Sequence, residues 1–386
     1  MNVLSACSIS LFPLNYFFQY LYYTDTGSTF FILLAYYHQL KENYKISALS
    51  GAIAILFRQT NVIWVVFFLG QQLLANIDTF VKKSSKSKVL VKSDASSINL
   101  VANQRIKKPS NLFEFFSHTT AEVFDSKDFE LQKFLVKLYK EDFWGKKLIY
   151  HDLLNVIDMN QMRPYLMTIS TFVFFVLVNN GIVVGDRSNH TASFHLCQVL
   201  YFWSFSCFFS FSSFVFSYRK AKNLLAFLGS NLKLNFFVIL PILLIVVNNF
   251  TYEHAFLLAD NRHYTFYIWS RLFKRYDFVR YVLTPVYVIA GYLFFRNLNQ
   301  TGKTIGWLVA FSVCLFAGLV PQKLLEFRYF IIPYYIYRLN ISQLSLKEIF
   351  VEFFFNLLVN FATIYLFLHR VFFWPNTPDE PQRFMW

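Results

Sequence analysis

Hydrophobic residues along this sequence gather in runs long enough to cross a lipid bilayer, and short polar stretches separate the runs. A hydrocarbon core about 30 Å thick requires about 20 apolar residues per helix, and this length divides the chain into about eleven candidate spans. The candidate spans cover residues 3–21, 27–40, 46–58, 62–79, 164–184, 196–217, 233–250, 279–295, 304–320, 328–339 and 349–373. The pattern predicts an all-α fold, a polytopic transmembrane helix bundle.

Composition supports lipid as part of the solvent of this chain. Hydrophobic residues make up 56% of the 386 residues and charged residues only 15%, whereas roughly 25% charged residues are usual in soluble domains. Four cysteines lie in or beside apolar runs without paired spacing: Cys7, Cys197, Cys207 and Cys314. We therefore expect them to be small buried hydrophobic residues rather than disulfide or metal partners.

Positive charge is concentrated between residues 82 and 108. The formal net charge is +14, and this segment contributes Lys82, Lys83, Lys86, Lys88, Lys92, Arg105, Lys107 and Lys108. No motif for reading bases accompanies the cluster, so nucleic acid is not an expected partner. A basic loop between apolar spans instead indicates the cytoplasmic side of a membrane.

The same reasoning divides the chain into three regions. Residues 1–79 are predicted to hold N-terminal transmembrane helices, and residues 80–163 a basic cytoplasmic loop with an amphipathic helix near 129–139. Residues 164–386 are predicted to hold C-terminal transmembrane helices with lumenal site loops. The chain begins directly in an apolar run without a basic n-region, so its first span is expected to stay in the membrane.

Polar stretches then fall together on the face opposite the basic loop. They cover residues 22–25, 57–61, 179–195, 251–276 and 321–329, and glycosylation sequons at 189–191 and 249–251 agree with a lumenal side. Ionisable side chains at membrane level are costly, and the usual reason for them is a water-filled cavity that holds a substrate. Helix-end anchors and solvated ion pairs are the alternative interpretation of each stretch taken singly.

Several of these stretches resemble one family, the terminal α-1,2-glucosyltransferases of lipid-linked oligosaccharide assembly. The matching motifs are residues 22–25, 57–61, 185–188, 258–267, 321–329, 337–340 and 382–386, and together they extend along nearly the whole chain. The resemblance implies a GT-C fold in the endoplasmic-reticulum membrane with its active site at the lumenal ends of the helices. It implies glucose transfer from dolichyl-phosphate-glucose to the diglucosylated nine-mannose glycan on dolichyl diphosphate, with membrane lipids as further partners.

Such a reaction needs cations for the phosphate leaving group and a carboxylate for the acceptor's proton. The cations expected to bind phosphate are Arg58, Arg262, Lys323 and Arg328. The expected sugar contacts are Asp260, Asn261, His263 and Gln322. Asp186, Asp25 and Glu326 are the candidate catalytic carboxylates. No cofactor is expected. No metal is expected either, because no second ligand follows His263 at zinc-like spacing.

The resemblance also implies an N-terminal departure. Members of this family carry extra N-terminal sequence with an acidic first lumenal loop, where the catalytic base is expected, so this chain is predicted to be N-terminally shortened. The alternative function is therefore a catalytically inactive form that acts as a membrane interaction protein. A transporter or channel is a third hypothesis, because intramembrane charges also line ion paths.

Overall fold

The computed structural model of this chain describes residues 3–92, 158–184, 192–215, 235–341 and 344–386, together with residues 222, 225 and 229. Asp186, the sequon at 189–191 and the predicted amphipathic helix near 129–139 lie outside the described residues. Most of the predicted cytoplasmic loop lies outside them as well.

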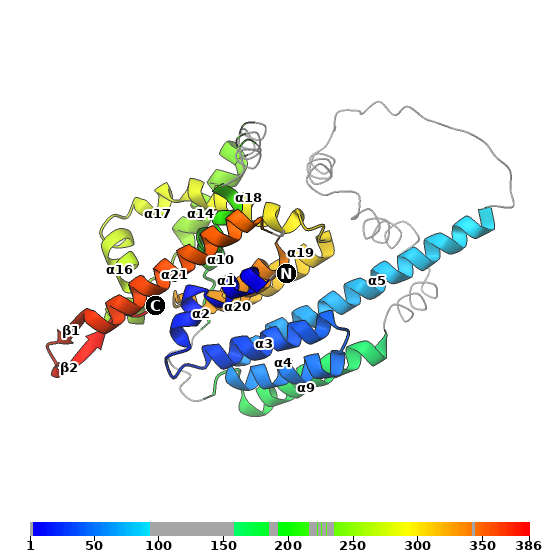
Figure 1. The fold of residues 1–386 in the computed structure, drawn as a ribbon, viewed down its shortest axis with the longest axis horizontal. Helices are drawn as coiled ribbons and strands as arrows, with labels where there is room; N and C mark the ends of the chain where they lie inside the picture. The colour runs from blue at the N-terminus through cyan, green and yellow to red at the C-terminus, as the bar shows by residue number, and fades with distance from the viewer. Residues whose placement is uncertain are drawn as a thin grey trace.

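The described chain is mainly helical (Figure 1). Its first part contains α1 (Val3–Ser10), α2 (Pro13–Phe18), α3 (Asp25–Leu40), α4 (Tyr44–Phe57), η1 (Gln59–Asn61), α5 (Val62–Lys92) and α9 (Met159–Asn179). Its middle part contains α10 (Cys197–Phe209), α11 (Ser212–Val215), η3 (Asn235–Ile239), α14 (Leu240–Asn249), α15 (Ala255–Ala259), α16 (Tyr264–Ile268) and η4 (Trp269–Phe273). Its last part contains α17 (Val279–Val282), α18 (Thr284–Asn299), α19 (Ile305–Leu319), η5 (Phe327–Phe330), α20 (Ile331–Asn340), α21 (Leu346–His369), β1 (Val371–Trp374) and β2 (Thr377–Arg383).

Among the described residues, three helical segments are long and apolar enough to cross a membrane by length and composition. They are Gln59–Ile77, Met159–Asn179 and Leu346–His369. Shorter apolar helices cover Tyr44–Phe57, Cys197–Phe209, Phe237–Asn249 and Ile305–Leu319. The prediction of an all-α transmembrane class is confirmed.

Several predicted spans are not single helices. The span predicted over 3–21 is divided into α1 and α2, because Pro13 lacks the N–H that a continuous helix requires and instead begins the second helix. Likewise, the span over 279–295 is divided into α17 and α18, with a proline near the start of the second. The span over 349–373 was extended too far, because the helix ends at His369 and the chain continues as a strand.

Helix α21 compensates for the break between α1 and α2. The side-chain amide of Asn356 donates to the carbonyl of Ser8 at 3.1 Å, and that of Asn360 donates to the carbonyl of Leu11 at 2.8 Å. Both asparagines are buried and lie one turn apart on the same helix face. In lipid no water can satisfy freed backbone carbonyls, so these amides replace the lost helix hydrogen bonds.

We therefore expect Asn360→Leu to destabilise the protein. The substitution leaves the Leu11 carbonyl unsatisfied, which costs on the order of 1–3 kcal/mol for a buried group. Thermal unfolding of the purified protein in detergent should show a lower melting temperature. Phe361→Leu is the matched control, because Phe361 is 69% exposed on the next position of α21; equal melting of the two variants would contradict this role for Asn360.

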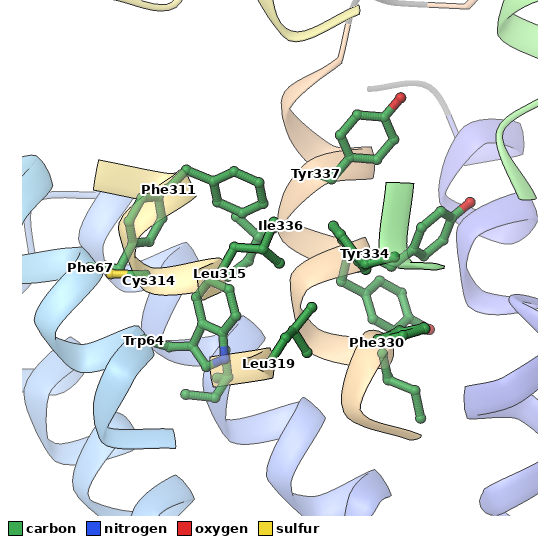
Figure 2. Close-up of a cluster of buried hydrophobic side chains, with 14 of the residues drawn as sticks. Trp64, Phe67, Phe311, Cys314, Leu315, Leu319, Phe330, Tyr334, Ile336 and Tyr337 are labelled. Carbon is green, nitrogen blue, oxygen red and sulfur yellow. The ribbon is translucent and has the colours of Figure 1, made fainter. Parts of the chain in front are cut away.

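Part of the main apolar core lies between α5, α19 and α20. Figure 2 shows Trp64 of α5 and Leu315 of α19 in this cluster, together with Tyr334 and other side chains of α20. Phe330, which ends η5 just before α20, is fully buried in the same core. The core therefore holds the polar segment that precedes α20 in a defined position.

A hairpin follows α21 and was not predicted from the sequence. β1 pairs antiparallel with β2, with Val371 opposite Arg383, and an irregularity separates Phe373 from Trp374. The guanidinium Nη1 of Arg383 donates to the carbonyls of Phe367 at 2.8 Å and Leu368 at 3.0 Å. Because these carbonyls belong to the last turn of α21, the hairpin caps the end of that helix.

Candidate active site

Four charged side chains meet where three helix ends come together. Asp25 begins α3, Arg58 follows α4, Glu326 precedes η5, and Arg328 lies within η5, which leads into α20. The Asp25 carboxylate, only 2% exposed, lies 2.9 Å from Arg58 Nη1 and 3.7 Å from Arg328 Nη1. Glu326 Oε2 lies 2.6 Å from Arg328 Nη2. The cluster is a chain of alternating charges, which we call the Arg58–Arg328 cluster.

Local sequence explains how Asp25 and Arg58 meet. A Cβ at Gly27 would collide with the ring of Phe57, so glycine allows the start of α3 to approach the end of α4 closely. Beyond Phe57 the backbone of Arg58 becomes extended, and the Asn61 amide then donates to the Ser28 hydroxyl and the Ala54 carbonyl, both at 2.7 Å. Arg58 is thus directed to a buried carboxylate instead of only marking a helix end.

A narrow cleft of about 40 Å³ lies beside the two arginines. It is lined by Arg58, Thr60, Asn61, Trp64, Leu315, Gly318, Leu319, Gln322, Arg328, Tyr329, Ile332 and Pro333. One part of this lining is cationic or amide-bearing, and the rest is aliphatic or aromatic. The cleft therefore combines anion-binding groups with walls that suit a hydrocarbon chain.

A second charged group lies in the loop between α15 and α16. Asp260 accepts hydrogen bonds from Arg262 Nη2 at 2.7 Å, from Arg262 Nε at 2.9 Å and from the Arg262 backbone N–H at 3.0 Å. Partial burial opposes ionisation of Asp260, but these hydrogen bonds outweigh it and hold the pKa of this carboxyl below its usual value. Asp260 is consequently anionic near neutral pH and suited to accept hydrogen bonds from hydroxyl groups.

A pocket of about 230 Å³ connects this loop with Glu326. It is lined by Phe256, Leu257, Ala259, Asp260, His263, Thr265, Leu324, Leu325 and Glu326. Two carboxylates and an imidazole therefore face a partly apolar cavity large enough for about one hexose unit. Glu326 joins the two parts of the site, since it lines this pocket and also binds Arg328.

Residues at the start of α10 hold the segment that carries Gln322 and Glu326 through its backbone carbonyls. The buried Gln198 amide donates to the carbonyls of Gln322 at 3.1 Å and Leu324 at 3.0 Å. The His195 Nδ1 atom lies 3.2 Å from the intervening Lys323 carbonyl. Burial lowers the pKa of His195 to about 4, so the ring is neutral and Nδ1–H can donate to that carbonyl.

Comparison with known proteins places the chain in a family. A family model described as the DIE2/ALG10 family matches residues 1–339. The chain belongs to the DIE2/ALG10 family. The family resemblance inferred from the short sequence motifs is thereby confirmed. No solved structure matches the chain significantly.

Two relatives of this DIE2/ALG10 member share the name Dol-P-Glc:Glc(2)Man(9)GlcNAc(2)-PP-Dol alpha-1,2-glucosyltransferase. The Homo sapiens relative is 41% identical over 385 residues, which cover 100% of this chain and 73% of that protein. The Drosophila melanogaster relative is 33% identical over 388 residues, which cover 99% of this chain and 74% of that protein. The similarity thus extends along the whole of this chain.

The structure of this family member distributes the predicted site residues between two groups. Asp25, Arg58, Glu326 and Arg328 form one group, with Gln322 lining the adjoining cleft. Asp260, Arg262 and His263 form the other, with His263 Nε2 3.7 Å from the Asp260 carboxylate.

The structure shows other contacts for two predicted site residues, whose proposed roles stay predictions. Asn261 accepts a hydrogen bond from Trp374 and is absent from the lining of both cavities. Lys323 contributes a backbone carbonyl to the contact with His195, and within the described ranges its ammonium forms no ion pair.

Sequence reasoning missed His195, Gln198 and Trp374. Each acts through a contact with a residue more than 100 positions away. The available signal was weak: His195 and Gln198 are polar residues at the start of an otherwise apolar run. Among the described residues, no group of three or more His, Cys, Asp or Glu side chains is arranged to hold a metal ion.

Proposed function

We propose that this chain transfers glucose from dolichyl-phosphate-glucose to the diglucosylated, nine-mannose glycan carried by dolichyl diphosphate. The observation that carries the proposal is the 41% identity, along the full chain, with the human protein named for this reaction. The three helices of membrane-spanning length and composition in the described part of the chain agree with substrates that are both attached to lipids.

The reaction requires one displacement at C1 of the donor glucose. The bond between C1 and the phosphate oxygen breaks, and its electron pair leaves with dolichyl phosphate. A new bond forms between C1 and an acceptor 2-hydroxyl oxygen, whose proton passes to a carboxylate. A single displacement inverts the configuration at C1, so we propose an inverting mechanism.

In this proposal Arg58 and Arg328 bind the donor phosphate. Guanidinium groups form strong charge-assisted hydrogen bonds with phosphate and stabilise the charge that develops on the leaving group. The apolar side of the adjoining cleft, which includes Trp64 and Ile332, would contact the first part of the lipid. Asp25 holds the two guanidinium groups in position from the buried side.

The 230 Å³ pocket is proposed to hold the terminal glucose of the acceptor. Asp260 would accept hydrogen bonds from its hydroxyl groups, and His263 would accept from or donate to them. Among the described carboxylates, Glu326 fits the role of proton acceptor best, because it lines this pocket and is also bound to Arg328 beside the phosphate site. The donor glucose would then lie between the acceptor hydroxyl and the leaving phosphate, as a single displacement at C1 requires.

We further propose that this site faces the lumen of the endoplasmic reticulum. The basic segment from Lys82 to Lys108 favours the cytoplasm for the end of α5, and the charged helix ends of the site belong to the opposite face. Tags inserted after residues 186 and 262 should report the lumen, and a tag within 82–108 the cytosol. The reversed result would exclude this orientation.

The activity is tested by expressing this chain in cells that lack their own terminal glucosyltransferase. Analysis of the lipid-linked glycans should show conversion of the diglucosylated form to the triglucosylated form. Membrane insertion and expression level are measured in the same cells with an epitope tag. Persistence of the diglucosylated glycan despite normal insertion would contradict the proposed function.

A further inference from the structure

The last residues of the sequence pair with the loop that carries Asp260. The backbone N–H of Met385 donates to the carbonyl of Arg262 at 2.9 Å, and the N–H of Tyr264 donates to the carbonyl of Met385 at 3.0 Å. The Nδ1 atom of His263 lies 2.6 Å from the backbone oxygen of Trp386. Residues 384–386 therefore form a short strand-like contact along residues 262–264.

Trp374 contacts the same loop from the end of β1. Its indole Nε1–H donates to Oδ1 of Asn261 at 2.7 Å. The guanidinium carbon of Arg262 lies 5.1 Å from the centre of the Trp374 ring, a cation–π contact. Arg262 is consequently held on one side by Asp260 and on the other by Trp374.

Both contacts depend on a hairpin that is itself anchored. Arg383 binds the last turn of α21, and Phe372 packs against Phe384 with ring centres 5.0 Å apart. The Trp386 ring lies 6.2 Å from that of Phe327, which is next to Glu326. By contrast, the loop at 260–263 connects two helices of only five residues each, which offer it little support.

We propose that Trp374 is a positioning residue, which holds Asn261 and Arg262 so that Asp260 and His263 face the acceptor sugar pocket. Nothing in the family match assigns this role, because that match ends at residue 339. The inference rests on the proposed function, since it assigns the pocket to the acceptor. Among the described residues, no ion pair joins the Arg58–Arg328 cluster to the hairpin, so the donor site should not depend on Trp374.

Two substitutions separate the contributions of the indole. Trp374→Phe keeps an aromatic ring beneath Arg262 but removes the N–H that binds Asn261, whereas Trp374→Ala removes both contacts. Phe373→Ala is the matched control, because Phe373 is the neighbouring aromatic residue of β1 and is 54% exposed. All three variants should fold, because none of them removes the Arg383 contacts that anchor the hairpin.

Steady-state transfer is measured in membranes with defined donor and acceptor lipids. We expect Trp374→Ala to raise the acceptor KM by about tenfold, from the loss of a cation–π contact and a hydrogen bond, with the donor KM within about twofold of the wild type. The acceptor KM of Trp374→Phe should lie between those of the wild type and Trp374→Ala. The acceptor KM of Phe373→Ala should equal that of the wild type. An unchanged acceptor KM in Trp374→Ala, or an equal rise in Phe373→Ala, would overturn the proposal.

Hydrogen exchange tests the same positioning independently of catalysis. The N–H groups of Arg262 and Tyr264 are hydrogen-bonded in the wild type, so their exchange should accelerate in Trp374→Ala and not in Phe373→Ala. If the wild type transfers no glucose but this difference appears, the proposed function fails, whereas the ordering of residues 260–263 by Trp374 stands. If the wild type is active and exchange is unchanged, the positioning role fails alone.

Discussion

Replacing Arg328 with glutamine should lower glucose transfer by at least about a hundredfold, a loss typical of removing one group that stabilises developing negative charge. Arg328 lies between the Asp25 and Glu326 carboxylates and lines the cleft proposed for the donor phosphate. Glutamine keeps one N–H2 donor group, but it is shorter than arginine and lacks the charge. The rate constant kcat at saturating donor and acceptor is the measurement that shows the effect.

Two further variants test whether the loss of activity is specific to the charge and geometry of Arg328. Arg328→Lys keeps the charge but not the forked geometry, so it should retain part of the activity. Arg280→Gln removes an arginine from an exposed pair with Asp277, and should transfer glucose at the wild-type rate. Wild-type turnover in Arg328→Gln, with normal melting, would exclude Arg328 from the catalytic site.

The second large effect is expected on stability, at a buried ion pair between α20 and α21. Arg338 Nε lies 2.6 Å from Glu352 Oε1, and the two side chains are 5% and 2% exposed. Ser8 of α1 donates to the same carboxylate at 3.0 Å. Glu352→Ala leaves a buried guanidinium without its partner, which costs about 3–5 kcal/mol. The variant should therefore melt well below the wild type in detergent, or fail to accumulate in membranes.

A double variant distinguishes charge from packing at this position. Arg338→Leu together with Glu352→Leu removes both charges, so it should recover part of the stability that Glu352→Ala loses. Asp277→Asn is the exposed control, since the Asp277 side chain is 81% exposed and its pair with Arg280 contributes little. Wild-type melting of Glu352→Ala would show that the pair is not important for the fold.

Hydrophobic runs were sufficient to predict the class of this fold. A bilayer allows few ways to satisfy the backbone, so long apolar segments predict helices with little ambiguity. The polar segments at 57–61 and 321–329 could also be recognised as parts of a candidate site, because charged residues are rare between apolar spans. Arg58, Glu326 and Arg328 were proposed on this basis, and the structure places them close together.

Helix breaks were not predicted from hydropathy. Residues 3–21 are apolar enough for one span, but Pro13 ends the continuity of the backbone hydrogen bonds. Whether such a break is stable depends on donors elsewhere, and here Asn356 and Asn360 supply them from α21, more than 340 positions away. No local pattern reports such a partner.

The residues that orient the site could not be predicted from the sequence for the same reason. Trp374, His195 and Gln198 look like ordinary members of apolar or loop segments, and their roles come from contacts with chain segments distant in sequence. Local composition fixes which segments prefer lipid or water, since that preference is a property of each side chain. The partners of a given amide or indole follow instead from how the helices pack, because hydrogen bonds and ring contacts act only over a few ångströms in space.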